Sequence, residues 1–181
     1  MPYYTGIGSR KTPPDVEKTM KVIGFKLAQT GFVLRSGGAQ GADSAFEEGC
    51  NVASGAKEIW LPWNGYDGRY EQRYLPSPKA YELAATLHPV WDQLSPGARS
   101  LHARNTHQVL GEDLRTPSLF TVCWTPDGAE TLERLSSRTG GTSTAIKLSI
   151  LNNVPVFNIK NPASYKRFKD FLRINYPSAL T

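Results

Sequence analysis

The sequence predicts an α/β fold in which a doubly wound, mainly parallel sheet carries helices on both faces. Short apolar runs alternate with amphipathic helical patterns along most of the chain, as strands and helices do in such folds. Leu119–Trp124 is apolar almost throughout, which is typical of a strand covered on both faces. Phe32–Ser36 runs directly into a glycine-rich turn and a helix start. That order predicts a strand, a phosphate-sized turn and a helix N-terminus.

Each expected strand is a short run rich in apolar residues that is bounded by turn-forming residues. Leu119–Trp124 is the most apolar of them. Parallel strands joined by helices follow from this alternation. The expected strands are Tyr3–Ile7, Phe32–Ser36, Glu58–Leu61, Leu119–Trp124 and Val154–Ile159.

The expected helices show apolar residues at helical spacing. The first begins at Pro13–Pro14 and carries one stripe of Val16, Met20, Ile23 and Leu27, at steps of four, three and four. Such spacing predicts a single buried face. The other helices of the alternating pattern are Ala42–Ala53, Thr144–Leu151 and Ser164–Ile174.

With 181 residues, we expect one domain over residues 1–181. Residues 62–116 depart from the simple alternation and form an expected insertion, with an aromatic loop followed by helices near Pro78–Leu87 and Ser100–Gly111. Insertions of this kind often cover a site, so this one could be a lid. Its candidates for stacking against a ligand ring are Trp63, Tyr66, Tyr70 and Tyr74.

The formal net charge of +5 weakly favours anionic partners. The basic cluster within residues 160–173 alternates with apolar residues at helical spacing, which predicts a solvated helix face and leaves nucleic-acid binding as the alternative. No apolar run approaches the roughly 20 residues of a membrane span, and we expect a cytoplasmic protein. Cys50 and Cys123 lie in apolar contexts, which predicts buried free thiols.

Three loops should leave the strands at one sheet edge, where ligands bind in open α/β folds. They are Gly6–Lys11, Ser36–Asp43 and Ser136–Thr144, and two of them lead into helix N-termini that favour anions. For Asp43, two roles remain open: capping of its helix and contact with a ribose hydroxyl. The candidate ligand-binding residues from these loops are Gly8, Ser9, Arg10, Ser36, Gly37, Gly38, Gly41, Ala42, Asp43, Thr139, Gly140, Gly141, Thr142 and Ser143.

These motifs resemble the SLOG superfamily of Rossmann-like nucleotide-binding proteins, which includes the DNA-processing protein A family and the LOG phosphoribohydrolases. The matching stretches are Thr5–Arg10, Ser36–Asp43 and Thr139–Thr142. The resemblance implies a Rossmann-like sheet and a site for a nucleotide-derived ligand. It also implies that Arg104 faces the phosphate or base and that Asn105 supports it. We expect Arg10 and Arg104 to lie at the site and outside the core.

The sequence departs from the LOG pattern at Ala145, where the resemblance implies a catalytic glutamate. A methyl group can neither stabilise an oxocarbenium-like centre nor activate water. Glu130 and Glu133 precede the loop and are the available substitutes. Whether the chain is an enzyme is therefore left open; if it is one, the expected reaction is N-glycosidic hydrolysis.

We expect the chain to bind a nucleotide or an ADP-ribose-type ligand, which includes cyclic signalling nucleotides, as a sensor or a sequestering protein. Related domains act in antiviral defence, so a phage-encoded sponge is one form of this hypothesis. The alternatives are a nucleoside monophosphate phosphoribohydrolase and a single-stranded DNA binder. No metal is expected, because His88, His102 and His107 lack ligand-like spacing. No organic cofactor is expected either, because Lys11 stands where a dinucleotide fingerprint has its third glycine. We also expect a homo-oligomer.

Overall fold

The structure is a computed structural model that describes residues 1–70 and 73–180. Its centre is a five-stranded sheet with the order β3-β2-β1-β4-β5, and every neighbouring pair is parallel. The predicted doubly wound α/β, Rossmann-like fold class is therefore confirmed. The strands are β1 (Tyr3–Gly8), β2 (Val33–Ser36), β3 (Lys57–Ile59), β4 (Thr121–Trp124) and β5 (Val156–Asn158).

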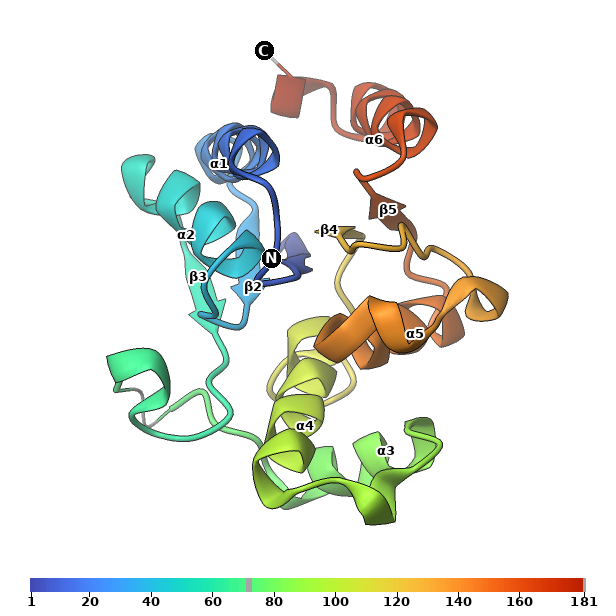
Figure 1. Cartoon of the computed structure of the whole chain (residues 1–181). Coiled ribbons are helices and arrows are strands. Elements are labelled where there is room, and N and C mark those ends of the chain that lie inside the picture. Colours follow the sequence, from blue (N-terminus) through green and yellow to red (C-terminus); the bar gives the residue numbers. More distant parts are fainter. Residues whose placement is uncertain (71–72, 181) are drawn as a thin grey trace.

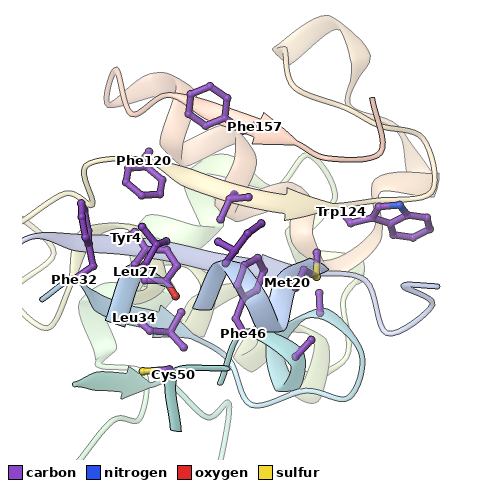
Figure 2. Packing of buried hydrophobic residues seen from close by; sticks show 14 of the residues in the cluster. Tyr4, Met20, Leu27, Phe32, Leu34, Phe46, Cys50, Phe120, Trp124 and Phe157 are labelled. Atoms are coloured by element: carbon purple, nitrogen blue, oxygen red, sulfur yellow. The ribbon is translucent and has the colours of Figure 1, made fainter. Parts of the chain in front are cut away.

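Helices cover both faces of this sheet (Figure 1). One apolar cluster joins α1, α2 and α6 to one face, and Figure 2 shows its centre around Tyr4, Phe46 and Phe120. A second cluster joins α3, α4 and α5 to the other face through Ile7 and Cys123. The helices are α1 (Pro14–Gln29), α2 (Ala42–Val52), α3 (Pro78–Leu87), α4 (Pro96–Leu110), α5 (Ser143–Leu151) and α6 (Pro162–Asn175).

The strand order places a switch point between β1 and β4. From β1 the chain moves outward through α1, β2 and α2 to β3, and then returns by way of α3 and α4 to β4 on the other side of β1. The loops after β1 and β4 therefore leave the sheet toward opposite faces. Ligands of open α/β proteins bind in the crevice that such a divergence creates.

The structure differs from the prediction at two places, one just before the insertion and one within it. The strand predicted over Glu58–Leu61 ends at Ile59. Trp60 and Leu61 are buried, but the Leu61 N–H donates to the Tyr74 carbonyl and not to a neighbouring strand. Helix α4 starts at Pro96 rather than near residue 100, because the Ser95 hydroxyl accepts the Ala98 N–H at 3.2 Å. Serine before a proline at the first helical position is a strong start signal, which the turn-like sequence concealed.

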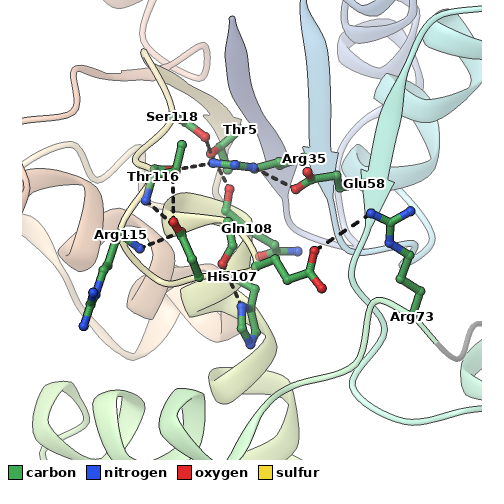
Figure 3. A network of polar contacts seen from close by, with 12 residues as sticks. Thr5, Arg35, Glu58, Arg73, His107, Gln108, Arg115, Thr116 and Ser118 are labelled. Atoms are coloured by element: carbon green, nitrogen blue, oxygen red, sulfur yellow. Dashed lines mark hydrogen bonds and ion pairs between the residues drawn. The ribbon is translucent and has the colours of Figure 1, made fainter. Parts of the chain in front are cut away.

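A buried arginine, Arg35, anchors the segment that leaves α4. Its Nε donates to Glu58 at 2.9 Å and its Nη1 donates to the Thr116 carbonyl at 2.6 Å (Figure 3). The guanidinium also lies 3.8 Å from the ring centre of Tyr3. A Cβ at Gly111 would approach Arg35 Nη2 to 2.3 Å, so glycine is needed there. These contacts make Arg35 a structural residue that fixes the C-terminal end of α4.

The structure bears on three further predictions from composition. Cys50 and Cys123 are buried free thiols, as predicted. Helix α6 buries Phe168 and Leu172 and leaves its basic residues exposed, which confirms a solvated basic face. Within the described residues, no helix is both long and apolar enough to cross a membrane.

Candidate functional site

A cleft of about 670 Å³ opens at the carboxyl edge of the sheet, beside the switch point between β1 and β4. Its walls come from the segment after β1, the β2–α2 connection, one face of α4, the segment after β4 and Tyr66. The lining residues are Ile7, Gly8, Ser9, Arg10, Lys11, Ala39, Asp43, Tyr66, Leu101, Arg104, Asn105, Gln108, Pro126, Ser137, Arg138, Thr139, Gly140, Gly141 and Thr142.

Residues 37–41 form the first glycine loop, and this loop is tightly packed. A Cβ at Gly37 would lie 2.3 Å from Gln108 Nε2 and 2.6 Å from Arg104 Nη1. Gly41 has φ of 85°, and a Cβ there would lie 2.6 Å from the Ser9 carbonyl oxygen. Its glycines therefore allow close packing. Of the predicted binding residues in this region, the structure leaves these off the cleft wall: Ser36, Gly37, Gly38, Gly41 and Ala42.

Ser137–Thr142 forms the second glycine loop, a short 3₁₀ segment that leads into α5. No described atom lies within 4 Å of a Cβ built at Gly140 or Gly141. Gly140 has φ of 68°, a conformation that favours glycine. Gly141 has neither a positive φ nor a crowding neighbour. Its missing side chain leaves room on the cleft side of the loop.

The half-buried carboxylate of Asp127 holds the second glycine loop in place. The Asp127 carboxylate accepts the hydroxyls of Thr139 and Ser136 at 2.5 and 2.8 Å, and also that of Thr125. Burial would raise the pKa of Asp127, but these hydroxyl donors hold the pKa below its ordinary value. The loop is thus fixed by a charged acceptor beneath it. Ser143 begins α5 and does not line the cleft.

Two successive residues of α4 hold one glycine loop each. Arg104 Nη1 donates to the Gly37 carbonyl at 2.8 Å, and Asn105 Nδ2 donates to the Gly141 carbonyl. Arg104 is only 7% exposed, so the expectation that it lies outside the core is wrong. Its Nε is buried and has no hydrogen-bond partner in the described part of the chain. Arg104 therefore fixes the first glycine loop, as Asn105 fixes the second, and it keeps unused donor capacity beside the cleft.

Arg10 and Tyr66 meet across the mouth of the cleft. Arg10 Nη2 donates to Asp67 at 2.8 Å and also to the Tyr66 hydroxyl. The guanidinium carbons of Arg10 and Arg104 lie 5.4 and 5.8 Å from the centre of the Tyr66 ring. Of the four aromatic residues predicted to stack, the structure brings Tyr66 to the cleft wall and packs Tyr74 on Trp60 instead.

Asp43 lies at the floor of the cleft and is 3% exposed. Its Oδ2 accepts the Ala39 N–H at 3.3 Å, and the carboxylate also accepts the Gly8 N–H. Burial raises the pKa of Asp43 to about 6, although Arg104 and these N–H donors oppose the rise. Asp43 thus fixes the first glycine loop and also carries an incompletely compensated negative charge.

Ala145 occupies the position of the expected catalytic glutamate, and Glu130 and Glu133 are its suggested substitutes. None of the three lines this cleft. Ala145 is fully buried among apolar residues. Glu130 accepts the Asn158 N–H and pairs with Arg167 at 2.6 Å, and Glu133 is exposed. Among the described residues, Asp43 is the one acidic side chain that lines the cleft. The hypothesis that Glu130 or Glu133 substitutes for the glutamate is therefore wrong.

Several lining residues were not predicted from the sequence. Leu101 and Gln108 lie on α4 at positions three before and four after Arg104, which is one face of a helix. This spacing is the signal that would have identified them. Ile7, Lys11, Ala39, Ser137 and Arg138 belong to the predicted loops without having been singled out, and the side chain of Pro126 gave no signal.

Comparison with known proteins identifies no family for this chain. A scan against protein-family models and a search of curated proteins both gave no match. Among solved structures, the chain is similar to DNA processing protein A from Helicobacter pylori, described as having a unique single-stranded DNA binding mode. The identity is 16% and the TM-score 0.37, over 93% of this chain and 81% of that chain. At this level of similarity, the assignment of the site depends on its own geometry.

Proposed function

We propose that this chain binds a nucleotide or an ADP-ribose-type ligand, with a phosphate on the second glycine loop. Gly141 is the observation that carries the proposal. Neither backbone conformation nor packing requires glycine there: its φ is not positive, no described atom lies within 4 Å of a built Cβ, and Gly141 lines the cleft. A ligand that approaches the backbone closely explains the glycine. The N-terminus of α5 follows at Ser143 and favours an anion at this place.

The charges around the cleft support an anionic ligand. Arg10, Lys11, Arg104 and Arg138 line it, against the one carboxylate of Asp43. Guanidinium groups bind phosphate through paired N–H donors. The excess of positive charge therefore suits a ligand with one or more phosphates.

The size and the apolar part of the cleft support a ligand with a ring system. A volume of about 670 Å³ falls within the range usual for sites of small molecules. Tyr66, Leu101, Ile7 and Pro126 supply apolar and aromatic surface, which suits a nucleobase. Phosphate at one end and a base at the other is the composition of a nucleotide.

Capture without cleavage is the form of the proposal that suits a cleft whose described lining holds one carboxylate, that of Asp43. Hydrolysis of an N-glycosidic bond commonly uses carboxylates that stabilise the sugar cation and activate water. Asp43 is held by backbone N–H groups, and Ala145 stands where the LOG glutamate would be. We propose a sensor or sequestering role, in which the bound molecule is released intact.

The test begins with native mass spectrometry of freshly purified protein, followed by chromatography of the released molecule. Calorimetry with ADP-ribose and AMP then compares the wild-type protein with the Gly141→Ala variant. We expect nucleotide binding that weakens about tenfold or more in this variant, as overpacking by one methyl group implies. Gly97→Ala is the matched control, because its Cβ meets only Trp63 at 3.7 Å and Gly97 is not among the lining residues.

Other outcomes distinguish the alternatives. Release of a free base from AMP would replace the proposal with N-glycosidic hydrolysis. Binding of an oligonucleotide that falls steeply with salt and ignores Gly141→Ala would favour a single-stranded DNA binder. The absence of any ADP-ribose or AMP binding in the wild-type protein, with no nucleotide recovered from the purified chain, would contradict the proposal.

A further inference from the structure

The Asp43 carboxylate occupies the position where the first glycine loop would otherwise bind an anion. Asp43 stands in the first turn of α2, where free N–H groups attract negative charge. Its oxygens accept the N–H groups of Ala39 and Gly8, from the loops after β2 and β1. The chain therefore supplies its own anion at this helix N-terminus.

At Gly37 and Gly41, protein atoms fill the space through which a phosphate would approach the first glycine loop. Gly37 faces the side chains of Arg104, Gln108 and Asp43 at 2.3 to 2.6 Å from a Cβ position. Gly41 faces the backbone of Ser9 and Arg10 at 2.6 to 3.0 Å. A phosphate near Asp43 would also face a carboxylate, which repels it. The group that a ligand presents to Asp43 is therefore uncharged or cationic.

Asp43 and Arg104 together present unused acceptor and donor capacity. A carboxylate offers about four acceptor sites, and the described chain provides two backbone N–H donors to Asp43. Arg104 Nε has no partner among the described residues. Asp43 Oδ2 and Arg104 Nη1 each lie 2.6 Å from the Cβ position of Gly37, so the two side chains are neighbours. A hydroxyl group both donates and accepts, and it matches this pair.

The adjacency of the two loop contacts on α4 points to a hydroxyl of the ligand's sugar. Asn105 contacts the second glycine loop at Gly141, and the adjacent residue Arg104 contacts the first at Gly37. The proposed phosphate position and Asp43 therefore flank neighbouring residues of one helix. In a nucleotide, the pentose is the part that is joined directly to the phosphate.

We propose that Asp43, with Arg104 beside it, binds the ribose hydroxyls of the ligand and makes the site selective for ribonucleotides. This inference rests on the proposed function, since it places the phosphate on the second glycine loop. It assigns the two glycine-loop regions different parts of one ligand. Phosphate lies at Gly140–Gly141, and the 2′- and 3′-hydroxyls lie at Asp43.

The experiment compares AMP with 2′,3′-dideoxy-AMP by calorimetry on the wild-type chain. Both probes carry the same base and phosphate, so their ratio of dissociation constants reports the hydroxyls alone. We expect AMP to bind about tenfold more tightly or better, as hydrogen bonds to a charged group imply. Asp43→Asn should bring this ratio close to one, because the amide no longer offers a charged acceptor to the hydroxyls. Circular dichroism establishes that the variant is folded.

Equal binding of AMP and 2′,3′-dideoxy-AMP to the wild-type chain would overturn the inference, and this arm needs no variant. A preference for AMP that persists in folded Asp43→Asn would overturn it as well, because another group would then contact the hydroxyls. In both cases the proposed function stands as long as binding still weakens in Gly141→Ala. If the proposed function itself is wrong, neither AMP nor 2′,3′-dideoxy-AMP shows binding that weakens in Gly141→Ala.

Discussion

The two glycine loops share a Gly-Gly pair and have opposite surroundings. In the first loop, a Cβ built at Gly37 would clash with neighbouring side chains, and one built at Gly41 would clash with backbone atoms. In the second, Gly140 and Gly141 face open space along the cleft. A glycine can thus serve either the packing of the protein or the approach of a ligand. Only the neighbours of the missing Cβ distinguish the two roles.

The largest expected effect is the loss of stability in Gly41→Ala. The new Cβ would lie 2.6 Å from the Ser9 carbonyl oxygen, at a residue with φ of 85°. Left-handed strain and a backbone clash together should cost roughly 3 to 4 kcal/mol, as measured by urea denaturation. Gly68→Ala is the matched control, with φ of 74° and no described neighbour within 4 Å. It should lose only about 1 to 2 kcal/mol, and equal losses would show that the first loop is not packed as described.

Arg104→Ala should destabilise the protein by about 2 to 3 kcal/mol, because it removes a buried charged donor and leaves the Gly37 carbonyl without its partner. Ligand binding should weaken as well. Asn105→Ala removes the corresponding bond to the second loop and should cost only about 1 kcal/mol, as a neutral hydrogen bond does. Both losses are measured by urea denaturation. A larger loss of stability in Asn105→Ala than in Arg104→Ala would contradict the conclusion that the first glycine loop is the more tightly packed one.

The buried carboxyl of Asp43 predicts a pH dependence of stability. Its pKa is about 6 in the folded state, above the value of about 3.9 in an unfolded chain. The folded state therefore binds the proton more tightly, and stability is lost as the pH rises from about 4 through 6. Asp43→Asn lacks this loss. Relative to this variant, the wild-type protein should become less stable by on the order of 2 kcal/mol between pH 4 and pH 7, measured by urea denaturation. A difference that is constant with pH would show an ordinary carboxyl.

The smallest effect on stability is expected in the second loop. Gly141→Ala adds a methyl group to open space and should change the free energy of unfolding by less than about 0.5 kcal/mol. The same variant should weaken nucleotide binding about tenfold or more. Thermal unfolding without and with AMP measures both quantities on one sample. A stability loss like that of Gly41→Ala would mean that the second loop is packed too.

The buried positions of the core could be predicted because they follow from the spacing of apolar residues within short stretches of the chain. The stripe of Met20, Ile23 and Leu27 is buried as its spacing indicates, and Trp60 and Trp124 are core residues, as expected for tryptophans within apolar runs. The start of α4 was less predictable. Ser95–Gly97 has the composition of a turn, and a turn and a capped helix start use the same residue types.

The candidate site was predictable in position and less so in composition. Gly8, Arg10, Asn105 and Gly141 line the cleft, as their loops and the resemblance suggested. The burial of Arg104 was not predictable, because it depends on Gly37, which is 67 positions away in the chain. That Tyr66 and not Tyr74 lines the cleft could not be predicted either, because Tyr74 packs against the Trp60 ring.

The sequence by itself determined the strands, the helices and the three loops that meet at one edge of the sheet. Periodicity and turn chemistry act over a few neighbouring residues, so they can be recognised without a structure. Only the tertiary structure decided which glycine loop is filled and which is open. That difference arises because α4 places Arg104 and Gln108 against Gly37 and leaves Gly141 facing the cleft, and contacts between distant segments are fixed only when the chain packs.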